Sequence, residues 1–214
     1  MAVSDTRRRI LDTARDLFNA HGLHRVGVRD IARALEISPG NLAYHFATKD
    51  ELVTELVREL HELNAASVFA ELPQGFSLYT LYETAAAAMR NMLQYRFQLL
   101  SYFDVVSTSP ELKRLEAELW GERRRRFDVM LGLLAENGFI ERRRLGARAD
   151  LLYEQGQIIS SGWLLAETLR KAPRSDEAAV LHYAKVGCAL LEPYCTAKGM
   201  RQMQQILRGG CDER

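Results

Sequence analysis

The sequence lacks the features that define several large classes of protein. Its 214 residues include 5 prolines and only 3 cysteines, Cys188, Cys195 and Cys211. An odd set without zinc-finger spacing is typical neither of a secreted disulfide framework nor of a structural zinc site. No apolar run approaches the roughly 18 residues that a membrane-spanning helix requires. We therefore expect free cysteines that pack as small apolar side chains, and no association with a membrane.

Signals for export, catalysis and cofactor binding are also missing. The first residues, MAVSDTRRRILDTARDLF, mix acidic and basic side chains, unlike a secretory signal or an acid-poor transit peptide, so we expect a cytoplasmic protein. The histidines have no metal-binding spacing, and neither a glycine-rich phosphate loop nor a nucleophile elbow occurs. We therefore expect a protein that is not an enzyme and that has no cofactor and no metal.

The apolar residues that are present recur at helical spacing, whereas the period-two alternation of strands is absent. Turn-forming stretches at LPQGFS, STSP, ENGF and KAPRSD divide the later part of the chain. The sequence therefore predicts an all-α fold. After the first fifty residues, helices are expected over about 49–70, 77–95, 97–107, 110–137, 146–171 and 176–195, with a tail to about 208.

The first fifty residues predict three helices in quick succession. The first ends at Gly22, the second covers about 28–35, and Ser38 caps the third, with Pro39 at its first position. Two short helices joined by a tight turn form a helix-turn-helix. The positions expected in its core are Ile31, Ala32, Leu35, Ile37, Leu42 and Phe46, which leaves the opposite side of the third helix to point outward.

Charge is distributed unevenly along the chain. Residues 1–49 carry eight Lys or Arg and five acidic residues, whereas the remainder has a small negative net charge. A basic front is compatible with a small domain that binds a polyanion. We expect a head at residues 1–50 and an all-helical body at residues 51–208, joined by a long helix that begins at the capping pattern Thr48-Lys49-Asp50-Glu51.

The segment VRDIARALEISPGNLAYHFATKDEL resembles the tetracycline-repressor (TetR) family of bacterial transcription regulators. The match covers about residues 5–55 and ends in the pattern Tyr-x-Phe-x-x-Lys before a long helix. The resemblance implies a homodimer whose third helices enter successive major grooves of double-stranded operator DNA. It also implies a body that forms the dimer and binds a small effector.

The resemblance also assigns DNA contacts by position. Arg29, Asn41 and Ala43 match base-reading positions, and Ser38 caps the helix that carries them. The positions that match phosphate contacts are Gly40, Tyr44, His45, Thr48 and Lys49. Arg and Asn side chains bind base edges, whereas a Tyr hydroxyl and a Lys ammonium commonly bind phosphate. Each residue also has a structural interpretation: Thr48 as a helix cap, Lys49 as surface, and His45 as packing.

Two positions depart from the family pattern. Gly27 stands where members usually carry Thr or Ser, which removes a side-chain cap of the second helix. Ala43 stands where an aromatic is frequent, which removes a large contact with DNA while leaving a methyl group that could meet a thymine. We expect operator reading to differ from that of relatives at Ala43.

The predicted helix over 146–171 has two apolar stripes, so it must be buried on two sides. One side can be the core of the body and the other a partner subunit. The helix over 176–195 is similar, and we expect the two helices to form a four-helix bundle with their dimer mates. The interface residues would be Leu151, Ile158, Gly162, Leu165, Leu169, Val180, Ala184, Gly187, Cys188 and Leu191.

An effector site is expected among the remaining helices, lined by Met89, Met92, Phe103, Trp120, Arg123, Phe127 and Trp163. Arg123 is informative because it falls on an apolar stripe, where a charge must be paired or must face a wet cavity. It would form either an internal salt bridge, with Asp104 or Glu154, or a pocket for an acidic effector. A body that docks a protein partner instead of a small molecule is the alternative function.

Overall fold

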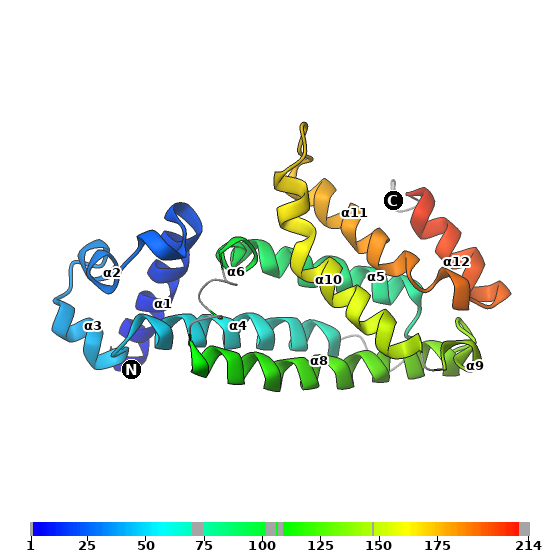
Figure 1. Ribbon diagram of the computed structural model, residues 1–214, viewed down its shortest axis with the longest axis horizontal. Helices are drawn as coiled ribbons and strands as arrows, with labels where there is room; N and C mark the ends of the chain where they lie inside the picture. Colours follow the sequence, from blue (N-terminus) through cyan, green and yellow to red (C-terminus); the bar gives the residue numbers. More distant parts are fainter. Residues whose placement is uncertain (1, 70–74, 102–105, 107–108, 147, 210–214) are drawn as a thin grey trace. The chain divides into compact units, whose positions relative to one another are not determined.

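The structure is a computed structural model that describes residues 2–69, 75–101, 106, 109–146 and 148–209 of the chain. Within these residues the fold is all-α, as predicted, and the extended pairing is limited to one isolated antiparallel bridge between Ile140 and Cys195 (Figure 1). None of the described helices is long and apolar enough to cross a membrane. The chain divides into two compact units, residues 1–62 with 94–118, and residues 63–93 with 119–214.

The first unit contains the expected three-helix head. Its elements are α1 (Ala2–His21), the 3₁₀ turn η1 (Leu23–Arg25), α2 (Val28–Ala34), α3 (Pro39–His45), most of α4 (Lys49–Phe69), α6 (Arg96–Leu100) and the start of α8 (Pro110–Glu136). α1 ends at His21 and is followed by Gly22, whose positive φ of 83° favours glycine. One face of α1 is buried, with Ile10, Ala14 and Phe18 each 0% exposed.

Residues 94–100 belong to the first unit because α1 holds them. The Asn19 side chain donates to the Gln94 carbonyl at 2.8 Å and accepts from the Phe97 amide at 3.1 Å. The rings of Phe18 and Phe97 lie 5.3 Å apart. The helix predicted over 97–107 is observed as α6, and most of its predicted second half lies outside the described residues. The side-chain amide of Asn19 therefore bonds both to the carbonyl of the last residue of α5 and to the N–H of a residue in the first turn of α6.

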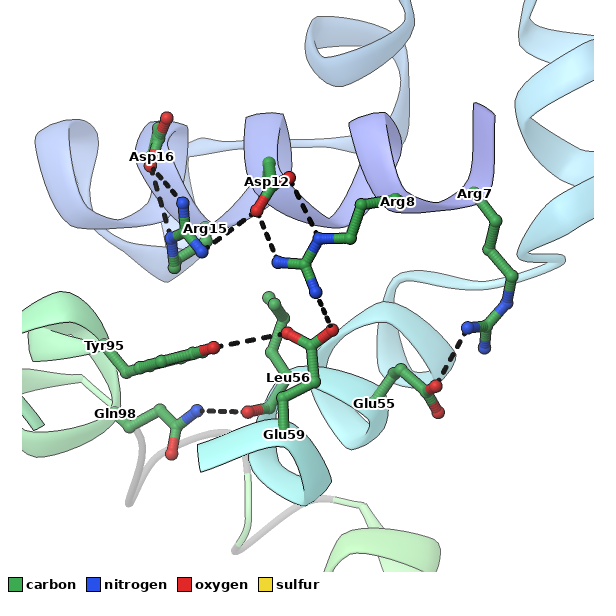
Figure 2. Close-up of polar contacts among 10 residues, drawn as sticks. All are labelled: Arg7, Arg8, Asp12, Arg15, Asp16, Glu55, Leu56, Glu59, Tyr95 and Gln98. Carbon is green, nitrogen blue, oxygen red and sulfur yellow. Dashed lines mark hydrogen bonds and ion pairs between the residues drawn. The ribbon is translucent and has the colours of Figure 1, made fainter. Parts of the chain in front are cut away.

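A row of charged side chains joins α1 to α4 (Figure 2). Arg8 pairs with Asp12 on its own helix and with Glu59 on α4, and Glu59 also accepts from the Tyr95 hydroxyl at 3.3 Å. Arg15 lies 3.0 Å from Asp12. Burial raises the pKa of the Tyr95 hydroxyl, and the neighbouring Glu59 carboxylate raises it further. Glu59 is thus shared between α1 and the residue that follows α5.

The second unit is built from most of α5 (Leu78–Gln94), the rest of α8, α9 (Arg142–Leu145), α10 (Arg148–Thr168), α11 (Asp176–Ala189), the 3₁₀ turn η2 (Glu192–Tyr194) and α12 (Ala197–Arg208). α11 packs against both α10 and α12 (Figure 1). The core of the second unit includes Trp163, Val180, Ala184 and Met203, all 0–1% exposed. The division into a head and a body at residue 50 remains a prediction. Residue 50 lies in the first turn of α4, which continues through it as one helix.

Two helices of the second unit are shorter than the sequence predicted. The helix expected over 146–171 begins at Arg148, because Gly146 has a φ of 41° and separates it from α9. The helix expected over 176–195 ends at Ala189, four residues before Pro193. A proline ring clashes with the carbonyl four residues earlier and has no N–H to donate. What was expected to be a tail is instead α12, capped by Thr196, whose side chain accepts from the Gly199 amide at 3.1 Å.

Candidate nucleic-acid interface

The third helix has the predicted capping and the predicted buried side. The Ser38 hydroxyl accepts from the Asn41 amide at 3.1 Å, and Pro39 occupies the first turn. Leu42 is 0% exposed and Phe46 is 2% exposed. An N-cap of this kind contributes about 1 kcal/mol to the stability of a helix. α3 is therefore fixed at its start by Ser38 and along one side by two apolar side chains.

The opposite side of α3 is available to a partner molecule. Gly40, Asn41 and Ala43 are exposed, and Tyr44 is 77% exposed, although large aromatic side chains are usually buried. His45 is half-buried, and its ring lies edge-on to that of Tyr44 at 5.2 Å. Outward-pointing residues of α3 thus form one surface of backbone, amide, methyl and phenol groups, and their contacts with DNA remain predictions.

The start of α2 compensates for the missing side-chain cap at Gly27. The carboxylate of Asp30 accepts from the Gly27 amide at 2.9 Å and pairs with Arg33 at 3.2 Å. This is the acidic half of a capping box, and an acidic side chain also suits the positive end of a helix. The local sequence signal for this cap is an Asp three residues after the cap position. Arg29 is exposed in the same turn, as a base-reading residue must be.

The turn between α2 and α3 is a Schellman-type helix end without glycine. The Ile37 amide donates to the Ala32 carbonyl at 3.1 Å, and the Glu36 amide donates to the Arg33 carbonyl at 3.2 Å. Glu36 has a φ of 56°, in the left-handed region that favours glycine. Leu35 and Ile37 were predicted to lie in the core but are only half-buried, because the turn carries them to the edge of the head.

Replacing Glu36 by Gly is expected to stabilise the head by about 0.5–1 kcal/mol, because a left-handed conformation is unfavourable for a side chain with a β carbon. The midpoint of urea unfolding of the full chain, followed by circular dichroism, measures the change. Glu36→Ala removes the charge but keeps the β carbon, so it should give little gain. An equal gain in both variants would mean that charge, rather than backbone conformation, is responsible.

The start of α4 is capped as the sequence predicted, with one difference in register. The Thr48 hydroxyl accepts from the Glu51 amide at 3.1 Å. The Glu51 carboxylate accepts from the amide of Ala47 at 2.8 Å, one residue before the cap. One N–H lies in the first turn of the helix and the other just before it, where no carbonyl of the same helix is available as an acceptor. The two bonds therefore satisfy both groups. Thr48 is therefore a helix cap in the structure, and its phosphate contact remains a prediction.

Lys49 has a structural contact that sequence reasoning missed. Its ammonium donates to the Leu23 carbonyl of η1 and lies 5.6 Å from the ring centroid of Phe18. Partial burial lowers the pKa of this ammonium, and the nearby Asp50 opposes the shift. No local sequence pattern indicates a bond to a carbonyl 26 residues away. An ammonium has three donors, so the contact with Leu23 leaves two of them for a phosphate. The phosphate contact of Lys49 remains a prediction.

The residues predicted for a dimer interface fall into two groups. On α10, Leu151 is 58% exposed, Ile158 70%, Leu165 49% and Leu169 76%. Gly162 lies between them, and a β carbon there would meet nothing within 4 Å. The other predicted stripe of α10 is largely internal, since Leu152 and Trp163 are buried. The exposed stripe remains a candidate interface.

The second group of predicted interface residues lies on α11 and just after it, and its members are covered within the chain itself. Val180 and Ala184 are 0% exposed and Cys188 is 2% exposed within the single chain, and Leu191, which follows the end of α11, is 4% exposed. α10 and α12 pack against α11 within the same chain, so this face forms core. Burial raises the pKa of the Cys188 thiol to about 12, consistent with the predicted inert, apolar role. Of the predicted residues on α11, only Gly187 is less buried.

The residues predicted for an effector site also separate into groups. On α8, the rings of Trp120 and Phe127 lie 5.0 and 5.6 Å from that of Tyr153 on α10. Trp120 is 44% exposed. Arg123 is half-buried beside Tyr153, where burial raises the pKa of the phenol and Arg123 opposes the rise. The guanidinium of the neighbouring Arg124 lies over the Tyr153 ring at 5.4 Å and pairs with the carboxylates of Asp128 and Asp150.

The second group is more deeply buried. Trp163 is 1% exposed, and its ring lies 5.8 Å from that of Tyr183. Met89 is 5% exposed and Met92 is half-buried. Phe103 lies outside the described residues. In the described part of the chain, the indole N–H of Trp163 is buried without a hydrogen-bond acceptor, an uncommon situation for a buried donor.

A capped, exposed helix held by a short turn against a second short helix defines a helix-turn-helix DNA-binding protein. Residues 10–56 match the family model of bacterial regulatory proteins of the tetR family, and residues 55–203 match that of TetR bacterial transcriptional repressors. The second match alone covers more than half of the chain. The chain therefore belongs to the TetR family of bacterial transcription regulators, which are not enzymes.

Individual relatives resemble the chain over part of its length. The transcriptional regulator UidR of Escherichia coli (strain K12) is 36% identical over 70 residues, 33% of this chain and 35% of that protein. The repressor KstR2 of Mycobacterium tuberculosis (strain H37Rv) is 43% identical over 56 residues, 26% of this chain and 28% of that protein. The chain thus matches about a third of the length of these relatives.

Solved structures share the fold over most of the chain. A TetR-family regulator from Marinobacter aquaeolei VT8 has a TM-score of 0.79 at 20% identity, covering 95% of this chain and 96% of that one. The structure of KstR2 of Mycobacterium tuberculosis has a TM-score of 0.63 at 22% identity, covering 89% and 95%. At these identities the likeness extends to the fold alone.

Proposed function

We propose that the chain is a homodimeric transcriptional repressor that binds a two-half-site operator through α3 and releases it when a small molecule binds the body. The observation that carries the DNA-binding part is the exposed side of α3. Ser38 caps the start of the helix and Leu42 packs its inner side against the head, while Asn41 and Tyr44 point outward. A helix in this setting fits the major groove of B-DNA, which is about 12 Å wide.

The exposed residues divide into two roles. Arg29 and Asn41 have the donors to read guanine or adenine edges, and Ala43 supplies a methyl group. Tyr44 supplies a hydroxyl for phosphate, and Gly40 allows the backbone of α3 to approach the duplex. Base contacts set sequence preference, whereas phosphate contacts set overall affinity. The two roles therefore give different responses to substitution.

Selecting bound sequences from random double-stranded DNA tests the DNA-binding proposal and supplies the operator. An enriched, roughly palindromic sequence is expected, because a two-fold dimer places two heads about one helical turn apart. If no sequence is enriched over a scrambled pool at moderate salt, the proposal fails. Release of the selected operator by candidate metabolites then tests the effector.

Tyr44→Phe is expected to weaken binding to the selected operator and to unrelated DNA by a similar factor, about threefold to tenfold, because it removes one hydroxyl that is assigned to phosphate. Fluorescence anisotropy on both DNAs measures it. Arg29→Ala is the matched contrast: it should weaken the selected operator more than unrelated DNA and relax preference at one base pair. A Tyr44→Phe variant with altered sequence preference and unchanged affinity would contradict the assignment.

The dimer part of the proposal rests on the exposed stripe of α10. Leu151, Ile158 and Leu165 repeat at seven-residue spacing, so they lie on one face of the helix. Gly162 adds a position where a second helix could approach closely. Apolar side chains aligned in this way on a surface mark interaction sites. A second copy of α10 packed across a two-fold axis would cover each stripe with its equivalent.

The effector part rests on the second unit. The buried indole N–H of Trp163 would be satisfied by a ligand with a hydrogen-bond acceptor, such as a carbonyl or hydroxyl oxygen. Two regulators of similar fold are known in complex with a small molecule, one from Saccharomonospora viridis with choline and SmeT with triclosan. A body that docks a protein would instead leave operator binding unchanged by small molecules.

A further inference from the structure

The end of α3 is controlled by one aromatic residue. Phe46 caps α3, donating its amide to the Leu42 carbonyl at 2.9 Å, and is 2% exposed. Its extended backbone turns the chain toward α4. Since α3 has only seven residues, its own hydrogen bonds fix its direction weakly, and packing at its ends must do so. At this end of α3, packing of the Phe46 ring therefore helps to fix the angle at which Tyr44 and Asn41 are presented.

Arg7 of α1 contacts this ring. Its guanidinium carbon lies 4.7 Å from the ring centroid of Phe46. The same guanidinium donates to Glu55 of α4 at 2.9 Å (Figure 2). A guanidinium is planar, so it can lie on an aromatic face and donate in its own plane at the same time. Arg7 therefore links the helix that precedes the helix-turn-helix, the end of α3 and the start of α4.

We propose that Arg7 is a positioning residue for operator recognition: by bridging the Phe46 ring and the Glu55 carboxylate it fixes the angle of α3, without contacting DNA itself. The inference rests on the proposed DNA-binding function. The Arg7 and Glu55 side chains are 42% and 32% exposed, and ion pairs this exposed add little to stability. Their contribution is geometric, because a binding site must be held within about 0.5 Å of its productive arrangement.

Two other roles for Arg7 make different predictions. If it bound a phosphate, any cation at this position would serve, and its loss would weaken all DNA and reduce the salt dependence of binding. If it were only structural, DNA binding would fall in step with stability. As a positioning residue, Arg7 requires its planar shape, and its loss affects sequence-specific binding selectively.

The test measures Arg7→Ala, Arg7→Lys and Glu55→Gln in the full chain on the selected operator and on unrelated DNA, at several salt concentrations. Arg7→Ala and Arg7→Lys are both expected to weaken operator binding about tenfold, the size of one lost base contact. Binding to unrelated DNA should change less than about twofold in Arg7→Lys, with the salt slope of the unsubstituted protein. Glu55→Gln should have a smaller effect in the same direction.

The control is Arg9→Ala, which removes an equal charge from an exposed position of the same helix. Unfolding midpoints of all variants are measured in parallel. Arg7→Lys with full operator affinity, or an equal loss on both DNAs, would overturn the proposal in favour of a phosphate contact. Loss of operator binding only in proportion to lost stability would also overturn it. Failure of the unsubstituted protein to prefer any sequence would instead overturn the proposed function.

Discussion

Replacing Ile158 by Glu is expected to convert the proposed dimer to a monomer and to weaken binding to the two-half-site operator by about 100-fold or more. Ile158 lies at the centre of the exposed stripe of α10 and is 70% exposed in the single chain. Two facing carboxylates in an apolar interface would be desolvated without partners. Losing the dimer removes the gain from linking two heads, which is typically 10²–10⁴. Light scattering and fluorescence anisotropy measure the two effects.

The control for this variant is Leu207→Glu, which makes the same kind of change on α12, where Leu207 is 37% exposed. It should leave the proposed dimer intact and bind the operator normally. Circular dichroism of Ile158→Glu should match that of the unsubstituted protein, because Ile158 makes little contact within its own chain. A dimer of unchanged mass in Ile158→Glu would remove α10 as the interface, whereas a monomer that still binds the full operator tightly would separate dimerisation from recognition.

Local signals made α3 predictable down to single residues. Ser38 and Pro39 mark a helix start whatever the surroundings, and Leu42 and Phe46, four residues apart, must share a face. The two apolar stripes of α10 likewise followed from periodicity, since a helix that is apolar on two sides needs two coverings. These features depend on residues within a few positions of one another, which a single sequence displays directly.

Features set by distant residues were not predictable in the same way. Periodicity showed that α11 has an apolar face but not that α12, a helix of the same chain, packs against it. The contacts of Lys49 with Leu23 and of Arg7 with Phe46 join residues far apart in sequence. The end of α11 at Ala189 is a different case, because Pro193 was a local signal that sequence reasoning overlooked.

Replacing Gly199 by Ala is expected to destabilise the second unit by about 3 kcal/mol, the upper end of the usual range for overpacking. A β carbon at this position would lie 2.9 Å from the carbonyl carbon of Phe139 and closer still to its oxygen. The neighbour is backbone, so it cannot rotate away as a side chain could. The same carbonyl accepts from the Thr196 amide at 3.0 Å, and moving it would break that bond. The midpoint of urea unfolding measures the loss.

Gly156→Ala provides the matched contrast because a β carbon there would meet nothing within 4 Å. In the interior of α10, alanine should stabilise the helix by about 0.5–1 kcal/mol relative to glycine. The same substitution is thus expected to lower the stability at one helical position and to raise it at the other. The difference depends on whether backbone atoms lie against the new β carbon. If Gly199→Ala left the unfolding midpoint unchanged, α12 would not dock on Phe139 as the structure has it, and the burial of the apolar face of α11 would need another cover.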